Sequence, residues 1–302
     1  MSDRQRVEFA SGADRCVGYL YAAPDAADCC VLMAHGFGGT QEGSIARNAA
    51  DLAAAGLPVL TFDYRGFGES GGAPRQVIDI GMQHEDWRAA ISFARTLPGV
   101  RADKVALWGS SLGGGHVLAI AAEDPAIAAV VAQVPFNGFP RKVEGRSRRD
   151  SLRLLRVALA DWIAGKRGDP PIYIKAVGEP GELAVMATPE AAHTVAAMDN
   201  PTWRNEVAPR ALIDMAFWYR PGRRARRLAM PVLLSLAERD KETPADATRP
   251  IARRAPRGEL RCYPCSHFQF YHEAVRPTVI ADQISFFRTH LIGFGALDGG
   301  AS

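Results

Sequence analysis

The first sixteen residues, MSDRQRVEFASGADRC, lack the apolar segment that a secretory signal peptide needs. No uninterrupted apolar run reaches the roughly 18 residues that span a membrane. The longest candidate, near residues 117–135, is broken by Glu123, Asp124 and Pro125. We therefore expect a soluble, cytoplasmic protein without a membrane partner.

The sequence also lacks a strong charge of one sign and a disulfide framework. Its formal net charge of +3 over 302 residues is too small to indicate a nucleic-acid or membrane partner by itself. An odd number of widely spaced cysteines argues against paired disulfides, and the lone C-x-x-C at 262–265 favours reduced structural thiols over a zinc site. The five cysteines are Cys16, Cys29, Cys30, Cys262 and Cys265.

What the sequence does contain is an alternation of short apolar runs with longer helical patterns. The runs are rich in Val, Leu and Ile without strict alternation, which is typical of parallel strands that are buried on both faces. This pattern predicts an α/β fold with a mostly parallel, doubly wound sheet. The expected strands are 16–22, 29–35, 58–64, 104–110, 127–134, 231–237 and 259–264, and the expected helices are 44–55, 77–96, 113–123, 245–254 and 273–291.

The alternation stops between residues 137 and 229, where no strand is evident and helical pieces such as 151–165 occur. The pattern then resumes, so we expect one core formed by 1–136 and 230–295 with a helical insertion at 137–229. The segment 21–28 is expected to be a hairpin turn between early antiparallel strands.

The segment GSSLG at 109–113 fits the pattern G-x-S-x-G between a strand and a helix. This pattern describes a sharp turn that holds the central serine, here Ser111, in a strained conformation with its hydroxyl exposed. The backbone N–H of Leu112 then points to the same side as that hydroxyl. A glycine-rich phosphate loop is the alternative, but neither phosphate-binding spacing occurs. The pattern indicates a serine nucleophile.

A serine nucleophile needs an oxyanion hole, and AHGFGG at 34–39 follows an expected strand. Flanking glycines allow the backbone there to approach the reacting centre, and Phe37 is the natural second N–H donor beside Leu112. Each such donor contributes roughly 3–4 kcal/mol to stabilising the transition state. His35 is expected to brace this loop and not to act as the base.

The acid and the base are expected after later strands. Asp240 is favoured as the acid over Glu238, which stands nearer the strand end, and over Asp246, which falls in a helix. His267 is favoured as the base over His272, which lies five residues later near the last helix. The remaining histidines are expected to be surface or core residues: His84, His116, His193 and His290.

The order Ser111, Asp240, His267 resembles that of the α/β-hydrolase superfamily. The resemblance covers nearly the whole chain and rests on HGFGG, FDYRGFGES at 62–70, GSSLGGG at 109–115, AERD at 237–240 and CSHF at 265–268. SHFQFY is loosely similar to the X-Pro dipeptidyl-peptidase and small esterase branch. The resemblance implies an α/β-hydrolase fold in which the insertion at 137–229 forms a lid.

The expected chemistry is hydrolysis of a small-molecule carboxylic ester or thioester through an acyl-enzyme, without a metal or organic cofactor. The alternatives are a C–C bond hydrolase, an X-Pro-type peptidase and a non-catalytic ligand-binding member of the fold. A protein that binds nucleic acid or a membrane surface through a basic lid is a further alternative, which only the arginine count supports. Between Arg141 and Arg167 there are nine basic and three acidic residues, and YRPGRRARR follows at 219–227. These basic residues indicate either recognition of an anionic substrate or, more often, a solvated face or an oligomer contact such as a homodimer. The insertion's aromatic residues are expected to line an acyl pocket or, more often, to form its own core: Trp162, Trp203, Phe217, Trp218 and Tyr219.

Overall fold

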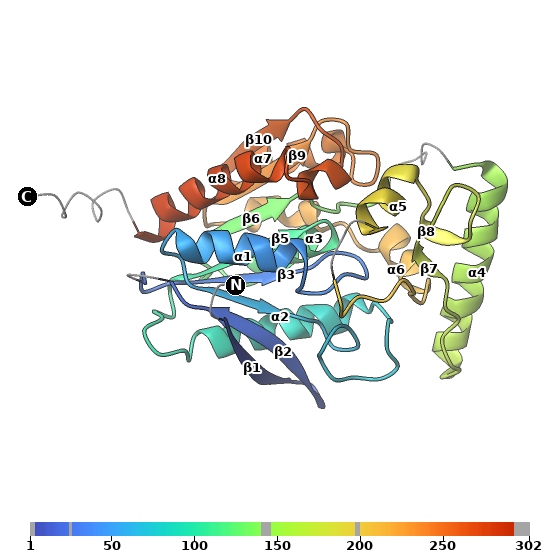
Figure 1. The fold of residues 1–302 in the computed structure, drawn as a ribbon, viewed down its shortest axis with the longest axis horizontal. Helices are drawn as coiled ribbons and strands as arrows, with labels where there is room; N and C mark the ends of the chain where they lie inside the picture. Colours follow the sequence, from blue (N-terminus) through green and yellow to red (C-terminus); the bar gives the residue numbers. More distant parts are fainter. Residues whose placement is uncertain (1–3, 24–25, 140–145, 197–199, 293–302) are drawn as a thin grey trace, which may run out of the picture.

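The computed structural model describes residues 4–23, 26–139, 146–196 and 200–292 (Figure 1). Its central sheet has eight strands in the order β1-β2-β4-β3-β5-β6-β9-β10. Those strands are β1 (Arg4–Ser11), β2 (Asp14–Tyr21), β3 (Cys30–Ala34), β4 (Val59–Phe62), β5 (Val105–Ser110), β6 (Val130–Gln133), β9 (Val232–Ala237) and β10 (Gly258–Tyr263).

Six neighbouring strands of the sheet, from β4 to β10, are parallel, and β1 and β2 form an antiparallel edge. The predicted hairpin at 21–28 is wrong, because β2 pairs with β1 and β4 and does not pair with β3. The hairpin instead joins β1 to β2 at Gly12 and Ala13, where Gly12 has φ 56°. β1 itself was not predicted, since only two of its eight side chains are fully buried.

Helices cover both faces of the sheet, which makes the fold a three-layer sandwich (Figure 1). Along β3, Leu32 packs in the core on the side of α2 and α3, whereas Val31 and Met33 pack on the side of α1 and α8. Because both faces are covered, most residues of the parallel strands from β4 to β9 are apolar, whereas the edge strand β10 contains Glu259 and Arg261. The helices of the core are α1 (Ser44–Ala54), α2 (Ile80–Ala94), α3 (Leu112–Ala121), α7 (Ala245–Arg254) and α8 (Arg276–Phe287), with the short helical segments η1 (Pro221–Arg227), η2 (Phe268–Tyr271) and η3 (Arg288–Ile292).

The segment 137–229, called the insertion from here on, leaves the sheet after β6 and returns to it at β9. It stands beyond one end of the sheet, with α4 as its outermost element (Figure 1). The prediction that it contains no strand is wrong, because two three-residue strands pair in parallel; such short strands carry no detectable alternation. Its elements before η1 are α4 (Arg148–Arg167), β7 (Lys175–Val177), β8 (Ala184–Met186), α5 (Pro189–Ala196) and α6 (Ala211–Phe217).

Backbone and side-chain hydrogen bonds fasten the insertion to core loops. The N–H of Ala208 donates to the carbonyl of Gln76 at 2.9 Å. The indole N–H of Trp203 donates to the carbonyl of Gly38 at 2.9 Å. The second bond matters for the site, because Gly38 belongs to the loop that follows β3.

Within the described ranges, no helix is both long enough and apolar enough to cross a membrane. All five cysteines are free thiols, and four of them are buried. Burial of four thiols fits the structural role expected of them, and the preference for thiols over a zinc site at 262–265 stays a prediction.

Candidate active site

Ser111 occupies the tight turn between β5 and α3, as the G-x-S-x-G pattern predicts. Its backbone has φ 57° and ψ −118°, a conformation that residues with a side chain rarely adopt. Two backbone hydrogen bonds hold it there: its N–H donates to Gln133 at 2.9 Å, and its carbonyl accepts from the N–H of Phe136 at 2.8 Å. Both partners belong to β6 or the residues just after it, so the neighbouring strand fixes the turn. Leu112 begins α3, as predicted.

The loop after β3 lies directly against this turn. A Cβ atom on Gly36 would stand 2.9 Å from the carbonyl oxygen of Ser110 and 3.6 Å from the backbone nitrogen of Leu112. Only a glycine permits that approach. It places Phe37, the next residue, beside the N-terminus of α3, and both Phe37 and Leu112 line the same cavity as Ser111.

His35 stands at the base of this loop and is buried. Its Nδ1 lies 3.0 Å from the carbonyl oxygen of Gly36, and burial lowers its pKa to about 4. A histidine bonded in this way braces the loop, which matches the expectation from the sequence.

Asp240 and His267 meet at the end of the sheet, although 27 residues separate them. Nδ1 of His267 donates to Oδ2 of Asp240 at 2.8 Å, and both side chains are buried. This bond fixes the tautomer in which Nε2 carries the lone pair, which a general base requires. His267 and Ser111 both line a cavity described below.

The carboxylate of Asp240 is held by a second residue that the sequence did not single out. The backbone N–H of Thr243 donates to Oδ1 of Asp240 at 2.7 Å, and the Thr243 hydroxyl lies 2.9 Å from Oδ2. The N–H of Glu242 donates to Oδ1 as well, at 2.9 Å. The turn after Asp240 therefore orients the acid, and no sequence motif marks this role.

Burial lowers the pKa of His267, but nearby negative charge outweighs burial. The charge of Asp240 and its hydrogen bond raise this pKa, and Glu242 and Glu190 add to the effect. The net result is a pKa above the usual 6.5. An imidazole in this setting is a stronger proton acceptor, and its protonated form is stabilised.

The structure does not bring the competing residues into this arrangement. Asp246 is fully exposed and lies 3.9 Å from Arg249, and Glu238 lies 3.9 Å from the same arginine. His272 Nε2 instead lies 2.9 Å from the hydroxyl of Thr194 on α5.

The remaining histidines lie elsewhere. His84 and His116 contact each other, with 3.1 Å between Nε2 of His84 and Nδ1 of His116. His193 is exposed on α5, and His290 lies 3.3 Å from Glu259. His116 is a fully buried core histidine, as expected.

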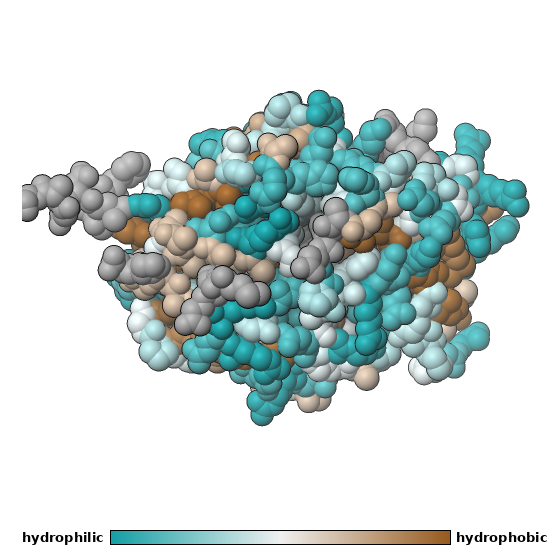
Figure 2. Space-filling model, viewed as in Figure 1, coloured by the Kyte–Doolittle hydropathy of each residue, from teal (hydrophilic) through white to brown (hydrophobic). Residues whose placement is uncertain are grey.

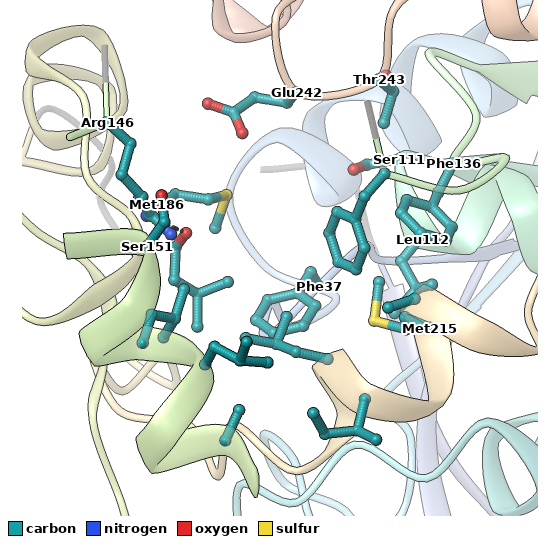
Figure 3. Close-up of a pocket in the computed structure, with 18 of the residues that line it drawn as sticks. Phe37, Ser111, Leu112, Phe136, Arg146, Ser151, Met186, Met215, Glu242 and Thr243 are labelled. Atoms are coloured by element: carbon teal, nitrogen blue, oxygen red, sulfur yellow. Dashed lines mark hydrogen bonds between the residues drawn. The ribbon is translucent and has the colours of Figure 1, made fainter. Parts of the chain in front are cut away.

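A cavity of about 370 Å³ opens beside Ser111, between the core and the insertion (Figure 3). Ser111 and Leu112 face it from the core, whereas Arg146 and Ser151 face it from the opposite side. Its wall is mostly aliphatic and aromatic. The residues of the insertion that contribute to that apolar wall are Phe139, Leu154, Leu155, Ala158, Val185, Met186, Leu212, Ile213, Met215, Ala216 and Phe217.

A second cavity of about 140 Å³ also borders Ser111. His267, Tyr271 and Trp203 line it, and its wall is more polar. Ser111 and Phe37 border both cavities. Ser111 therefore borders two cavities of different size and polarity.

Tyr271 is a further residue that the sequence analysis missed. Its hydroxyl lies 2.8 Å from the hydroxyl of Ser110, which also accepts a hydrogen bond from Gln133 at 3.1 Å. Gln133 in turn accepts from Gln283 on α8 at 3.0 Å. This buried chain of hydrogen bonds holds Tyr271 beside the nucleophile.

The five aromatic residues of the insertion divide between the cavity walls, the core and the surface. Phe217 lines the large cavity and Trp203 lines the small one, whereas Tyr219 is buried and Trp218 is exposed. Trp162 donates to Asp214 within the insertion at 3.3 Å. Of the basic residues counted above, Arg141 and Lys142 lie outside the described residues, as does Glu144 among the acidic ones.

Comparison with known proteins identifies the family of the chain. The sequence profile of the family described as serine aminopeptidase, S33, matches residues 25–276. The chain belongs to this family. Its members are α/β hydrolases, so the predicted α/β-hydrolase fold is confirmed, and this family member is an enzyme of the hydrolase class.

Among similar proteins is the quorum-quenching protein AidA of Acinetobacter baumannii, which is 37% identical over 286 residues, or 93% of each chain. The thiohydrolase apmlB of Arthrinium phaeospermum is 34% identical over 56% of this chain and 53% of its own length. The crystal structure of the α/β hydrolase GrgF from Penicillium superposes with a TM-score of 0.78 at 23% identity, covering 96% of this chain and 99% of GrgF. This last likeness concerns the fold.

Proposed function

We propose that this family member hydrolyses a carboxylic ester or thioester of a small molecule through an acyl-enzyme on Ser111. One observation carries the proposal: the strained Ser111 and the Asp240-bound His267 border the same cavity. This arrangement supplies a nucleophile, a base with its lone pair on Nε2, and an acid that orients the base.

The reaction proceeds in two halves. Nε2 of His267 takes the hydroxyl proton of Ser111 as the oxygen attacks the carbonyl carbon, and the N–H groups of Phe37 and Leu112 stabilise the oxyanion. The imidazolium, stabilised by Asp240, gives its proton to the departing alcohol or thiol. His267 then deprotonates a water molecule as its oxygen attacks the acyl carbon, and the imidazolium returns this proton to the Ser111 oxygen as the bond between that oxygen and the acyl carbon breaks. The carboxylic acid and the free Ser111 hydroxyl result.

The two cavities suggest which part of a substrate binds where. The large apolar cavity suits an acyl chain, because burying a CH₂ group contributes about 0.8 kcal/mol. The smaller, more polar cavity suits the alcohol or thiol part. On this proposal the insertion serves as the lid of the site, since it supplies most of the wall of the large cavity.

The names of similar proteins support an acyl substrate. Two of them are called thiohydrolases, from Arthrinium phaeospermum and Aspergillus aculeatus. The proposal therefore includes thioesters and oxygen esters equally as substrates.

A peptidase activity has one observation in its favour. The carboxylate of Glu242 borders the large cavity (Figure 3), where it could accept a free amino group. Burial raises the pKa of Glu242, however, which weakens a salt bridge to an ammonium group. Ester and thioester hydrolysis remains the better match to the apolar wall.

The test is hydrolysis of p-nitrophenyl esters of increasing chain length, acyl thioesters and aminoacyl amides by wild type and by Ser111→Ala. We expect turnover of esters or thioesters that Ser111→Ala loses by at least about 10³-fold. Preferential turnover of the amides would support the peptidase alternative. No turnover of any compound by a folded wild-type protein would contradict the proposal and favour a C–C bond substrate or a ligand-binding role.

A further inference from the structure

Large apolar side chains that are exposed to solvent gather on one part of the described chain. Every one with more than about a third of its surface exposed lies between Phe139 and Trp218. Phe217 and Trp218 are the most exposed, at 67% and 65%. The set consists of Phe139, Leu152, Leu155, Leu159, Ile163, Ile172, Tyr173, Phe217 and Trp218. Exposed apolar side chains, where they gather on one surface, mark a contact with another molecule.

Four members of this set form a stripe along α4, called the α4 stripe from here on: Leu152, Leu155, Leu159 and Ile163. At 3.6 residues per turn these positions share one side of the helix. The opposite side packs inward, because Ala158 and Asp161 are buried. Hydrophobic residues are visible at the right edge of Figure 2, where Figure 1 places α4 as the outermost element.

A basic flank runs beside the α4 stripe. By the same helical geometry, Arg149, Arg153, Arg156 and Arg167 fall together on one side of it. None of these four guanidinium groups forms an ion pair with a residue that the structure describes. An apolar stripe beside unpaired cations on a single exposed helix is the pattern of a helix that lies in a lipid interface.

The α4 stripe is continuous with the large cavity. Leu155 belongs to the stripe and also lines the cavity, and Phe139 and Phe217 are likewise both exposed and part of the wall. An apolar molecule could pass from this face to Ser111 along apolar side chains.

We propose that the exposed face of α4, together with Phe217 and Trp218, docks on an anionic lipid surface. The apolar side chains enter the boundary between headgroups and acyl chains, and the basic flank meets the lipid phosphates. The expectation of no membrane partner rested on a small net charge and the lack of a spanning segment. Neither property excludes a helix that binds the membrane surface without crossing it.

Charge argues against a second copy as the occupant. A twofold pair would present the same patch twice, so it would gather two basic flanks at one interface. No described acidic side chain pairs with these arginines, and like charges would oppose the contact. An anionic lipid surface offers acyl chains to the α4 stripe and phosphate groups to the basic flank.

The test is co-sedimentation of the full-length protein with vesicles, compared between phosphatidylcholine alone and equal parts of phosphatidylcholine and phosphatidylglycerol. We expect binding to the anionic vesicles that weakens as ionic strength rises. Leu152→Gln/Leu159→Gln should weaken binding about tenfold per side chain. Arg149→Glu/Arg153→Glu should weaken binding to anionic vesicles by at least about tenfold.

Matched control variants distinguish binding through this face from non-specific binding to vesicles. Leu159→Met keeps an apolar side chain, and Arg253→Glu/Arg254→Glu changes two exposed arginines at the end of α7. Both should bind vesicles like wild type. A blue shift of tryptophan fluorescence on vesicle binding should shrink in Trp218→Phe, which gives a second readout.

Three outcomes would overturn the proposal. They are no binding to anionic vesicles, equal weakening by the α4 and α7 arginine variants, and a wild-type dimer that Leu152→Gln/Leu159→Gln dissociates without any vesicle binding. The assay needs no turnover, so Ser111→Ala should bind vesicles like wild type. Failure here is therefore distinguishable from failure of the proposed hydrolase activity.

Discussion

A Cβ atom placed on Gly109 would lie 2.2 Å from the carbonyl oxygen of Gly113. The end of β5 and the first turn of α3 thus touch through their backbones. Ser111 lies between these two glycines, so any separation of the strand from the helix would move its hydroxyl.

Gly109→Ala should lower the free energy of unfolding by about 1–3 kcal/mol, because the methyl group has no space and the backbone must shift. Its kcat should fall as the turn moves. Gly71→Ala is the matched control, since the nearest atom to its added methyl group would be 3.4 Å away. Chemical denaturation and ester hydrolysis measure both effects. Wild-type values for Gly109→Ala would refute the argument.

Ser111 has a strained backbone, and two substitutions separate that strain from its chemistry. A side chain at φ 57° costs on the order of 1–3 kcal/mol, and glycine avoids that cost at an entropic penalty of about 0.5–1 kcal/mol. Ser111→Gly should therefore unfold with a free energy about 1 kcal/mol higher than Ser111→Ala. Both should lack hydrolase activity. Equal stability of the two variants would argue against stored strain.

The pH dependence of kcat/KM should reflect His267. The base must be unprotonated in the free enzyme, so activity should be lost as pH falls through a pKa that lies above 6.5. Asp240→Asn removes the largest cause that raises this pKa, so the midpoint should move down and kcat should fall about 10⁴-fold.

Glu242→Gln provides the comparison for that experiment. Glu242 raises the pKa of His267 through its charge alone, without a hydrogen bond to the ring. Its removal should move the midpoint down by less than Asp240→Asn does. A midpoint that neither variant moves would mean that a group other than His267 controls the profile.

Buried histidines should make the fold less stable in mild acid. Burial lowers the pKa of His35 and His84 to about 4 each, and that of His116 well below its usual value. The unfolded chain therefore binds more protons as pH falls from 6.5 toward 4, and the free energy of unfolding should fall with it. The raised pKa of His267 leaves this window unaffected, because its contribution is complete below pH 6.5.

Thermal unfolding at pH 6.5 and at pH 5, both at or below the limit where the contribution of His267 is complete, measures that effect. His84→Gln should flatten the dependence of Tm on pH, whatever it does to Tm itself. His193→Gln changes an exposed histidine on α5 and should leave the slope as in wild type. An unchanged slope in His84→Gln would contradict the assignment.

The proposed acyl cavity can be made shorter. Ala216 on α6 lines the large cavity, and Ala216→Trp would fill part of it. We expect the preferred acyl chain to become shorter while short-chain esters react as before. Ala160→Trp makes the same change at an exposed position of α4 outside the cavity wall and should keep the wild-type preference. A reduction for all chain lengths alike would argue against an acyl role.

The parts of the fold that could be predicted from the sequence are those with a strong local signal. Parallel strands such as β5 are buried on both faces, so their apolar runs stand out, and the turn at Ser111 carries its own glycine pattern. β7 and β8 were missed because three residues are too few for a period.

The pairing of Asp240 with His267 could be predicted from their order in the chain. The residues that hold the site in place could not be predicted. Thr243 and Tyr271 act through contacts with residues that are distant in the sequence or through turn geometry. Threonine and tyrosine occur in many loops, so neither residue type marks such a role. The misplaced hairpin has a similar cause: polar turn residues show where a chain bends and do not show which strand it rejoins.

The bond from Trp203 to the carbonyl of Gly38 joins the insertion to the loop that carries Phe37. A residue that lines the smaller cavity is thus hydrogen-bonded to the loop that carries the proposed oxyanion donor. An engineer who exchanges the insertion for that of a relative would also release one anchor of the Gly38 peptide. A graft that keeps Trp203 and its neighbour Thr202, whose hydroxyl donates to Thr40 at 2.9 Å, carries these attachments along with the new pocket.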